Sequence, residues 1–490
     1  LALDQGTTGS TALLIGDDGT IRGRGYREIR QHYPEPGWVE HDPEEIWHAT
    51  VAAAEAACGG ERPHAIGITN QRETIVAWER ATGRPVHHAI VWQDRRTAAR
   101  CRELAAAHGV ADLARRTGLV WDPYFSATKI EWLLREVPGL RDRAERGEIV
   151  FGTVDAWLIA RLSGGRTVVT DHTNASRTLL YDLGSRTWDD TLLDLFGVPR
   201  VALPDIVASS GVCATTMPDS PVGPDVPIAG IAGDQQAALF GQGCHIPGAA
   251  KNTYGTGAFL LMLVGDHRPE PDGRVLTTMA CDARGAPTLA AEGAIFVAGA
   301  ALQWLRDGLG LIETAAESEA LARSVPDTGG VVFVPALVGL GAPHWEADAR
   351  GTLVGLTRGT TAAHVARAAL EAMAYATREV VEAMTGAAGV PLRSLKVDGG
   401  AAANDWLMDF QATVLGVAVE RPDVVELTAF GAAGLAGMAT GIWRDADEFV
   451  RTRSYQRFEP SVALGRAAAS GYHAWERAVR AALFWARDRA

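Results

Sequence analysis

Two short runs rich in glycine and threonine have the composition of phosphate-binding turns. The first, residues 4–10 (DQGTTGS), follows a short apolar strand and contains Asp4, Thr7, Thr8, Gly9 and Ser10. Glycines let backbone N–H groups approach an anion, threonine hydroxyls add donors, and a carboxylate such as Asp4 can hold the water shell of Mg²⁺. The second, residues 252–257 (NTYGTG), leads into an apolar strand at 258–263. One such turn in each half predicts a duplicated fold that clamps one nucleotide between its halves.

Asp234 is the residue best suited to act as a base. It follows an apolar strand and Gly233, and this setting exposes a carboxylate at the C-terminal edge of a sheet, where α/β proteins bind ligands. Phosphoryl transfer to a hydroxyl needs a carboxylate that accepts the hydroxyl proton. Asp is also a preferred helix N-cap, and we expect Asp234 to cap the helix that starts at 235. Capping alone is an alternative explanation of the residue.

The adjacent pair Arg72 and Glu73 follows a buried strand at 65–68. A guanidinium fork and a carboxylate together can grip several hydroxyls of a polyol, although such a dipeptide is more often a surface ion pair. Three aromatic residues near strand ends, Trp92, Tyr124 and Phe259, can cover the C–H edge of a small polyol. The alternative for each aromatic residue is an ordinary place in the core.

A nucleotide base needs a flat slot with an amide beside it. The turn at 398–400 (DGG) gives such room at Gly400, and Asn404 supplies an amide. Gly299 and Gln303 lie at i and i+4 of a predicted helix and therefore share one face, from which they can line the same slot. Neither pattern is specific, because helical glycines usually reflect close packing.

Strands and helices must alternate to position these groups, so the predicted class is α/β. We expect strands at 74–78 and 86–92, a helix at 129–135, and long helices at 362–384 and after Asn404. A helix at 431–439 consists of small residues, which let two backbones pack closely, as an interdomain hinge requires. The boundary is placed near Gly243, giving domains 1–243 and 244–490.

Composition narrows the class of function. The chain has 490 residues and a net charge of −13, which argues against a general binder of nucleic acid or anionic membranes. No apolar run reaches the roughly 18 residues of a membrane span. Five scattered cysteines form no zinc pattern and favour a reducing cytoplasm over a disulfide framework.

Eight ordered segments resemble the FGGY family of carbohydrate kinases, nearly end to end. Residues 124–133 (YFSATKIEWL) fit the first family signature, and 351–356 (GTLVGL) running on to 370–371 fit the second. Residues 70–74 (NQRET) and 89–96 (AIVWQDRR) are similar to members that act on glycerol. The other segments are 3–8, 36–43 (PGWVEHDP), 233–241 (GDQQAALFG) and 252–257.

The resemblance implies an actin-like ATPase fold, in which two RNase-H-like domains enclose a central nucleotide cleft. It implies transfer of the γ-phosphoryl group of ATP to glycerol, giving sn-glycerol 3-phosphate, with Mg²⁺ bridging the phosphates and Asp4 and Asp234 holding the ion partly through water. Asp234 takes the proton. The residues matching glycerol-binding positions are Arg72, Glu73, Trp92, Tyr124, Asp234, Gln235 and Phe259. Those matching nucleotide-binding positions are Thr7, Thr8, Gly9, Ser10, Thr256, Gly299, Gln303, Gly400 and Asn404.

Two departures from the family pattern stand out. Many relatives have an arginine where this chain has Thr11, which removes one cationic contact to the nucleotide phosphates. Some bacterial relatives are inhibited by fructose 1,6-bisphosphate through a Gly-rich loop with cations. The matching stretch here, residues 217–225 (MPDSPVGPD), has no cation and two carboxylates, so we expect no such inhibition.

Three other functions compete with phosphorylation of glycerol. One is an FGGY kinase for a different polyol or ketose, the second is an actin-like ATPase module without a small acceptor, and the third is a catalytically dead regulatory relative. The Arg72 and Glu73 pair argues against the ATPase module, and an intact Asp234 argues against the dead relative. We expect a homodimer or homotetramer, no nucleic-acid partner and no membrane insertion.

Overall fold

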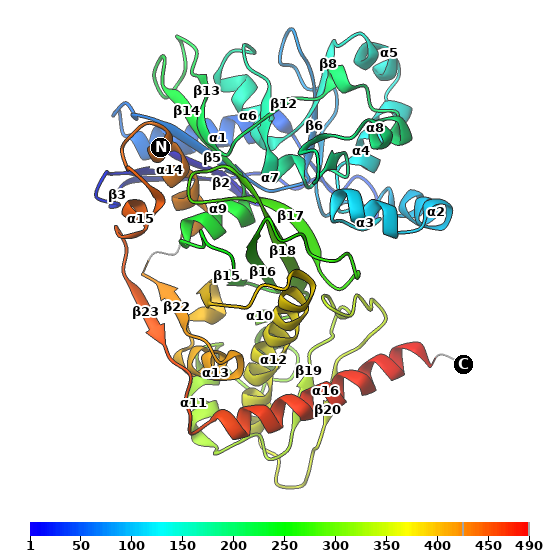
Figure 1. The fold of residues 1–490 in the computed structure, drawn as a ribbon, viewed down its shortest axis with the longest axis vertical. Helices are drawn as coiled ribbons and strands as arrows, with labels where there is room; N and C mark the ends of the chain where they lie inside the picture. Colours follow the sequence, from blue (N-terminus) through cyan, green and yellow to red (C-terminus); the bar gives the residue numbers. More distant parts are fainter. Residues whose placement is uncertain (424–425, 489–490) are drawn as a thin grey trace. The chain divides into compact units, whose positions relative to one another are not determined.

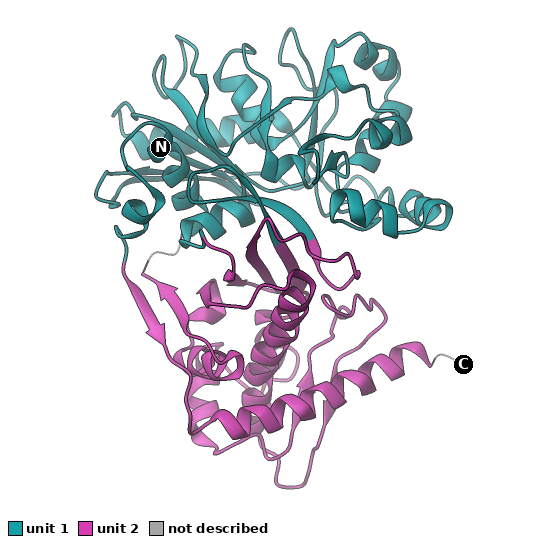
Figure 2. Ribbon diagram, in the orientation of Figure 1, with its two compact units in different colours: residues 1–245, 277–290, 426–453 teal, residues 246–276, 291–425, 454–490 magenta. Residues whose placement is uncertain are grey.

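Strands and helices alternate through the whole chain in the computed structural model, which describes residues 1–423 and 426–488 (Figure 1). The chain divides into two compact units (Figure 2). Unit 1 contains Leu1–His245, Thr277–Ala290 and Glu426–Arg453, and unit 2 contains Ile246–Leu276, Ala291–Val425 and Ser454–Ala490. The predicted boundary near Gly243 lies next to the first of these division points, and as a division of the chain by function it stays a prediction.

Unit 1 contains two larger sheets and two sheets of two strands each. Its strands are β1 (Ala2–Gln5), β2 (Gly9–Ile15), β3 (Ile21–Glu28), β4 (Glu40–His41), β5 (Ile66–Asn70), β6 (Ile75–Glu79), β7 (Ala89–Ile90), β8 (Ile149–Thr153), β9 (Val169–Asp171), β10 (Tyr181–Asp182), β11 (Thr187–Trp188), β12 (Asp205–Val207), β13 (Ser210–Thr215) and β14 (Pro227–Gly233). Of the two larger sheets, the larger has the order β13-β14-β5-β1-β2-β3, and the smaller has the order β4-β7-β6-β8.

The helices of unit 1 are mostly short. They are α1 (Pro43–Cys58), α2 (Ala98–His108), α3 (Ala111–Thr117), α4 (Ala127–Glu136), α5 (Leu140–Glu145), α6 (Val154–Leu162), α7 (His172–Ala175), α8 (Asp190–Phe196), η1 (Arg200–Ala202), α9 (Asp234–Gly241), α14 (Leu427–Ala439) and α15 (Ala446–Val450).

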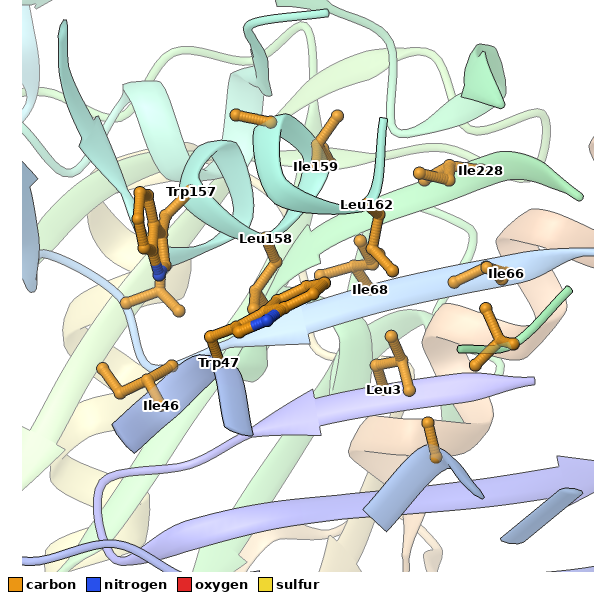
Figure 3. Close-up of a cluster of buried hydrophobic side chains, with 14 of the residues drawn as sticks. Leu3, Ile46, Trp47, Ile66, Ile68, Trp157, Leu158, Ile159, Leu162 and Ile228 are labelled. Carbon is orange, nitrogen blue, oxygen red and sulfur yellow. The ribbon is translucent and has the colours of Figure 1, made fainter. Parts of the chain in front are cut away.

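The two faces of the larger sheet are covered by different helices. Ile66 and Ile68 belong to a buried cluster with Trp47 of α1 and Leu158 of α6 (Figure 3). Because successive side chains of a strand point to opposite faces, Gly67 faces the other way, toward α14, where an added Cβ would overlap a backbone carbonyl of that helix. The small residues of α14 therefore allow close packing inside unit 1, as their composition predicted, and a hinge role stays a prediction.

Unit 2 repeats the strand plan of unit 1. Its strands are β15 (Ala249–Tyr254), β16 (Ala258–Gly265), β19 (Val332–Val334), β20 (Thr352–Val354), β21 (Ser394–Asp398), β22 (Val419–Pro422) and β23 (Tyr455–Phe458), while β17 (Leu276–Cys281) and β18 (Pro287–Ile295) contain residues of both units. The sheet order is β17-β18-β16-β15-β21-β22-β23. Its helices are α10 (Gly299–Asp307), α11 (Glu317–Ser324), α12 (Ala362–Ala388), η2 (Gly400–Ala403), α13 (Asp405–Leu415) and α16 (Gly465–Arg487).

The duplication predicted from the two turns is visible in the strand pairings. β1 pairs antiparallel with β2 and parallel with β5, and β14 pairs parallel with β5 and antiparallel with β13. β15 pairs in the same way with β16 and β21, and β22 in the same way with β21 and β23. The two Gly-Thr turns therefore occupy the same place in the two units, between the first two strands of each plan.

Two sequence predictions need correction. The strand predicted at 86–92 is reduced to β7, because the antiparallel strand β4 that pairs with it has only two residues. The N-cap of α9 is Gly233, and Asp234 is the first residue of the helix. No disulfide forms among the described residues, and no helix within them is both long and apolar enough to cross a membrane.

Candidate functional site

Three adjacent parallel strands of unit 1 end in register. Gln5 of β1 pairs with Asn70 of β5, and Asn70 pairs with Gly233 of β14. The residues that follow these strands therefore meet at one edge of the sheet, where open α/β sheets bind ligands. This register brings the first turn, the Arg72–Glu73 pair and Asp234 together.

Arg72 and Asp234 are in contact at this edge. Nε of Arg72 lies 3.4 Å from Oδ1 of Asp234; the Arg72 side chain is 2% exposed and the Asp234 side chain 34% exposed. Arg72 also donates hydrogen bonds to Oε1 of Gln236 (3.2 Å) and to the hydroxyl of Tyr124 (3.4 Å). The guanidinium is thus held from inside the protein, while the carboxylate opens to solvent, so the surface-ion-pair alternative for Arg72 does not apply.

Glu73 has a backbone conformation that is rare for a residue other than glycine. Its φ is 61°, and the N–H of Thr74 donates to the carbonyl of Arg72 at 2.7 Å, which closes a γ-turn around Glu73. The carboxylate is 1% exposed and accepts a 2.6 Å hydrogen bond from Nε of Arg177. Backbone strain of this kind is stored where the surroundings fix it, often at functional sites.

Two predicted aromatic residues lie beside this cluster. The rings of Trp92 and Tyr124 meet edge to face with centroids 5.5 Å apart. The indole N–H of Trp92 donates to the hydroxyl of Thr7 at 2.9 Å, which ties the aromatic pair to the first turn. Gln235 follows Asp234 on α9, is partly exposed, and its backbone N–H donates to Oδ1 of Asp234 at 2.7 Å.

The first turn presents only part of what the sequence predicted. The N–H of Gly6 donates to the carbonyl of Gly9 at 2.9 Å, which places Thr7 and Thr8 at the tip. A Cβ on Gly9 would lie 2.6 Å from the carbonyl oxygen of Arg27, so this glycine serves strand packing. Ser10 is 1% exposed and its hydroxyl is bonded to Thr50 at 2.9 Å. The structure does not bring the Ser10 side chain to the turn.

Asp4 is the candidate metal-binding carboxylate of this edge. Burial, and then the charge of the nearby Asp234, raise the pKa of Asp4 to about 7. A buried carboxylate whose pKa is raised by a neighbouring carboxylate fits a cation between or beside the two groups. Within the described residues no group of three or more His, Cys, Asp or Glu side chains could hold a metal. The two carboxylates Asp4 and Asp234 fit Mg²⁺, which usually takes one or two carboxylates, several waters and substrate phosphates.

In unit 2 the second turn lies against the start of α10. The N–H groups of Ala298 and Ala300 donate to the carbonyl of Thr256 at 2.8 and 3.0 Å, and that of Gly299 donates to Gly255 at 3.0 Å. A Cβ on Gly299 would lie 2.6 Å from the Gly255 oxygen. Close packing alone explains this glycine, and the structure brings Gly299 and the exposed Thr256 together.

The remaining candidates of unit 2 lie near the same turn in the fold. β15 and β21 pair in parallel up to Thr253 and Asp398, and Gly399 packs on the end of β15 with a φ of 86°. Gly400 is exposed and has open space around its Cα, as a flat ligand would require. Gln303 is exposed on α10, and Phe259 is half-buried on β16.

Asn404 has a clear structural role. Its Oδ1 accepts from the N–H of Leu407 at 2.9 Å, which makes it the N-cap of α13. Its Nδ2 donates to the hydroxyl of Ser318 at 3.4 Å. A contact with a nucleotide base would have to replace or share this long bond.

Comparisons with known proteins identify the family of the chain. Residues 1–241 match the N-terminal domain, and residues 250–440 the C-terminal domain, of the FGGY family of carbohydrate kinases. The chain is similar to a glycerol kinase of Dechloromonas aromatica (55% identity, 99% of this chain and 98% of the relative) and to one of Deinococcus radiodurans (53%, 100% and 98%). The chain belongs to the FGGY family of carbohydrate kinases.

Solved structures of FGGY kinases share the fold. A Plasmodium falciparum glycerol kinase with ADP has a TM-score of 0.94 at 33% identity, covering 99% of this chain and 98% of that one. A gluconate kinase from Lactobacillus acidophilus has a TM-score of 0.90 at 21% identity over 99% and 98%, which shows the fold alone. The α/β, two-domain, actin-like fold predicted from the sequence is confirmed.

Sequence reasoning missed several residues that hold the FGGY site in place. Arg177 and Gln236 fix Glu73 and Arg72 from distant segments. Lys129 is fully buried; its Nζ donates to the carbonyl of Tyr124 at 2.8 Å, and burial lowers the pKa of its ammonium to about 8. A buried lysine in the first family signature was a signal that could have been used.

The structure also shows where the two departures from the family pattern lie. Thr11 lies on β2 directly opposite Asp4. The stretch 217–225 carries no cation of its own, but Arg62 donates from another segment to the carbonyl of Pro224 at 2.6 Å. One guanidinium therefore lies against this loop, which the sequence alone did not reveal.

Proposed function

We propose that this protein transfers the γ-phosphoryl group of ATP to a terminal hydroxyl of glycerol, producing sn-glycerol 3-phosphate and ADP. The observation that carries the proposal is the contact of Arg72 with Asp234, beside Glu73 and Tyr124, at the edge where three parallel strands end. Full-length similarity to glycerol kinases at 53–55% identity supports the same substrate.

Each group at this edge has a chemical part in the proposal. Arg72, Glu73 and Tyr124, with Gln235, offer donors and acceptors to the hydroxyls of glycerol, and Trp92 covers its carbon edge. Asp234 accepts the proton of the terminal hydroxyl as the oxygen forms a bond to the γ-phosphorus, and the bond from that phosphorus to the β–γ bridging oxygen breaks. Since Arg72 holds Asp234 from inside the protein, the carboxylate is oriented before substrate arrives.

Mg²⁺ belongs to the proposal as a partner of the nucleotide. Asp4 and Asp234 would hold it, partly through water, and when bound it would neutralise charge on the phosphates. Thr7 and Thr8 in unit 1 and Thr256 in unit 2 are proposed to contact the phosphates. Gly299, Gln303, Gly400 and Asn404 are proposed to line the base pocket, and Phe259 to pack on glycerol.

The test is ADP release in a coupled assay with Mg-ATP and glycerol, no acceptor, or a panel of pentuloses and tetritols. We expect strong stimulation by glycerol alone. Stimulation by another polyol would keep the FGGY mechanism and replace the substrate. Slow, acceptor-independent release would instead favour the actin-like ATPase module, which needs no polyol grip.

Two properties complete the proposal. The cysteines form no disulfide among the described residues, and burial or partial burial raises the pKa of Cys101 and of Cys213 to about 11; such thiols suit a reducing cytoplasm. A homodimer or homotetramer is proposed from the behaviour of the family, and light scattering of the purified protein measures it.

A further inference from the structure

Six residues of unit 1 form a closed ring of hydrogen bonds through their side chains and two backbone groups, and one of them, Trp92, belongs to the proposed glycerol site. It joins the first turn to the aromatic residue at the polyol side and includes a histidine from the segment 36–43, whose role the proposed function leaves open. We call it the polar ring. Its members are Thr7, Gln31, His41, Gln71, Thr74 and Trp92.

The bonds of the ring can be followed from the turn outward. Gln31 donates to the carbonyl of Thr7 at 2.6 Å, and its Oε1 lies 2.9 Å from Nε2 of His41. Nδ1 of His41 lies 3.3 Å from Nε2 of Gln71.

The other half of the ring returns to the turn. The Thr74 hydroxyl donates to Oε1 of Gln71 at 2.8 Å and accepts from the backbone N–H of Trp92 at 3.1 Å. The indole of Trp92 then closes the ring on the Thr7 hydroxyl.

Backbone carbonyls fix the direction of both amides. Nε2 of Gln31 must face the Thr7 carbonyl, and Nε2 of Gln71 faces the carbonyl of Gly6 at 3.3 Å, because a carbonyl only accepts. Oε1 of Gln31 therefore needs a donor. Nε2 of Gln71 also donates to Oε1 of Gln5 at 3.0 Å, so its two hydrogens are shared among three acceptors, of which Nδ1 of His41 is one. The neutral imidazole with its proton on Nε2 supplies the donor to Gln31 and leaves Nδ1 as an acceptor facing the amide of Gln71.

Three members of the polar ring are buried, which makes the hydrogen bonds between them consequential for stability. His41 and Thr74 are 0% exposed and Gln71 is 2% exposed. Burial, and then His32, lower the pKa of His41 to about 4, so the imidazole stays neutral in neutral solution. A buried polar group that loses its partner destabilises the arrangement that buried it.

We propose that His41 is a positioning residue that holds the phosphate-side turn and Trp92 in one fixed arrangement. The inference rests on the proposed function, since Thr7 is assigned to the nucleotide and Trp92 to glycerol. Without His41, Thr7 and Trp92 keep their direct hydrogen bond but lose the second connection through Gln31, Gln71 and Thr74, so the pair is held less firmly in place. Misplacement of reacting groups by about 1 Å can lower a rate about 100-fold.

The test compares His41→Phe, which keeps a ring but no polar atoms, with His41→Gln, which again offers a donor and an acceptor. We expect His41→Phe to lower kcat about 10- to 100-fold at saturating glycerol and Mg-ATP, after correction for the folded fraction, and His41→Gln to stay within about threefold of the unaltered protein. His245→Phe is the matched control: it removes a buried histidine of unit 1, bonded to the Phe240 carbonyl, that lies outside the ring.

A double-mutant cycle with Trp92→Phe, which removes the indole donor, tests whether His41 and Trp92 act together in the polar ring. The combined variant should lose less activity than the product of the two separate losses, because either change alone opens the ring. A combined loss equal to that product would show that His41 acts independently of Trp92.

Amide hydrogen exchange separates this inference from the proposed function. His41→Phe should speed exchange at residues 5–8 and 90–93, and His245→Phe should not. If the unaltered protein shows no glycerol-dependent turnover, the proposed function is overturned. The exchange rates in His41→Phe and His245→Phe would still show whether His41 holds residues 5–8 and 90–93 in place. Unchanged exchange and kcat in His41→Phe, or an equal loss in His41→Gln, would overturn the positioning role.

Discussion

Nε of Arg72 lies 3.4 Å from Oδ1 of Asp234, although 162 residues separate them in the chain. The register between β5 and β14 produces this contact, because Asn70 and Gly233 are direct partners and the two side chains follow them. The Arg72 guanidinium, which is proposed to bind glycerol, and the Asp234 carboxylate, which is proposed to accept its proton, therefore form one cluster.

Asp234→Asn tests the base. The amide has nearly the same shape but cannot accept the hydroxyl proton, so we expect kcat to fall about 10²- to 10⁴-fold. Glycerol affinity, measured by isothermal titration calorimetry, should change little. An unchanged kcat would remove Asp234 from this role.

Arg72→Lys keeps the charge but loses the fork that reaches both Gln236 and Tyr124. We expect KM for glycerol to rise at least about tenfold, since 1.4 kcal/mol of lost binding corresponds to that factor, and KM for ATP to change far less. Arg95→Lys is the control, because Arg95 is half-exposed and pairs with Asp122. Equal rises in both KM values would make Arg72 structural.

Arg177→Met tests the support of the strained turn. Removing the guanidinium leaves the 1% exposed carboxylate of Glu73 without its 2.6 Å partner, and breaking a buried pair in this way costs about 3–5 kcal/mol. Urea denaturation measures this loss in the free energy of unfolding. Arg306→Met, which removes an exposed pair with Asp307, should cost less than about 1 kcal/mol; equal losses would contradict the prediction.

The pKa of Asp4 predicts a pH dependence of stability. The folded state raises it from 3.8 to about 7, so between these values the folded protein keeps a proton that the unfolded chain has lost. The stabilisation is complete below pH 3.8 and is lost as the pH rises through about 7. Thermal unfolding should therefore give a lower Tm contribution from Asp4 at pH 8 than at pH 5.

A matched comparison isolates Asp4. Burial, and then Asp171, raise the pKa of Asp155 to about 7 in the same unit, so Asp4→Asn and Asp155→Asn should each reduce the pH dependence of Tm. Only Asp4→Asn should also abolish turnover with Mg-ATP. If neither variant changes the pH dependence, other groups cause it.

Fructose 1,6-bisphosphate at millimolar concentration should leave turnover with glycerol unchanged. The stretch 217–225 carries Asp219 and Asp225, and the Arg62 guanidinium beside it already donates to the Pro224 carbonyl. Inhibition that disappears in Arg62→Ala would show that this one arginine suffices for a bisphosphate site.

The site residues that could be predicted best from the sequence are those that follow strands whose ends lie together in the fold. Asp234, Arg72 and Thr7 each follow a strand of the same sheet, and parallel strands bring their C-terminal ends to one edge. That edge was predictable from an apolar run followed by polar residues. Ser10 could have been excluded as well, because it shares its side of β2 with the core residues Ala12 and Leu14.

Other features depend on contacts that no local pattern indicates. Glu73 has a positive φ without a glycine beside it, and its partner Arg177 is 104 residues away in the chain. Nothing in the sequence around Gln236 distinguishes it from other helical residues, and only the structure shows that it accepts a hydrogen bond from Arg72. Long-range partners of this kind are set by the packing of distant segments.

The late return of the chain to unit 1 has a consequence for its synthesis. The face of the central sheet that receives Gly67 against α14 is completed by residues Glu426–Arg453. A ribosome must therefore translate as far as residues Glu426–Arg453 before that face is covered, and the earlier part of the nascent chain exposes apolar strands meanwhile. A fragment truncated near Gly243 should need chaperones to stay dispersed, and a peptide carrying α14, added in trans, should relieve that need.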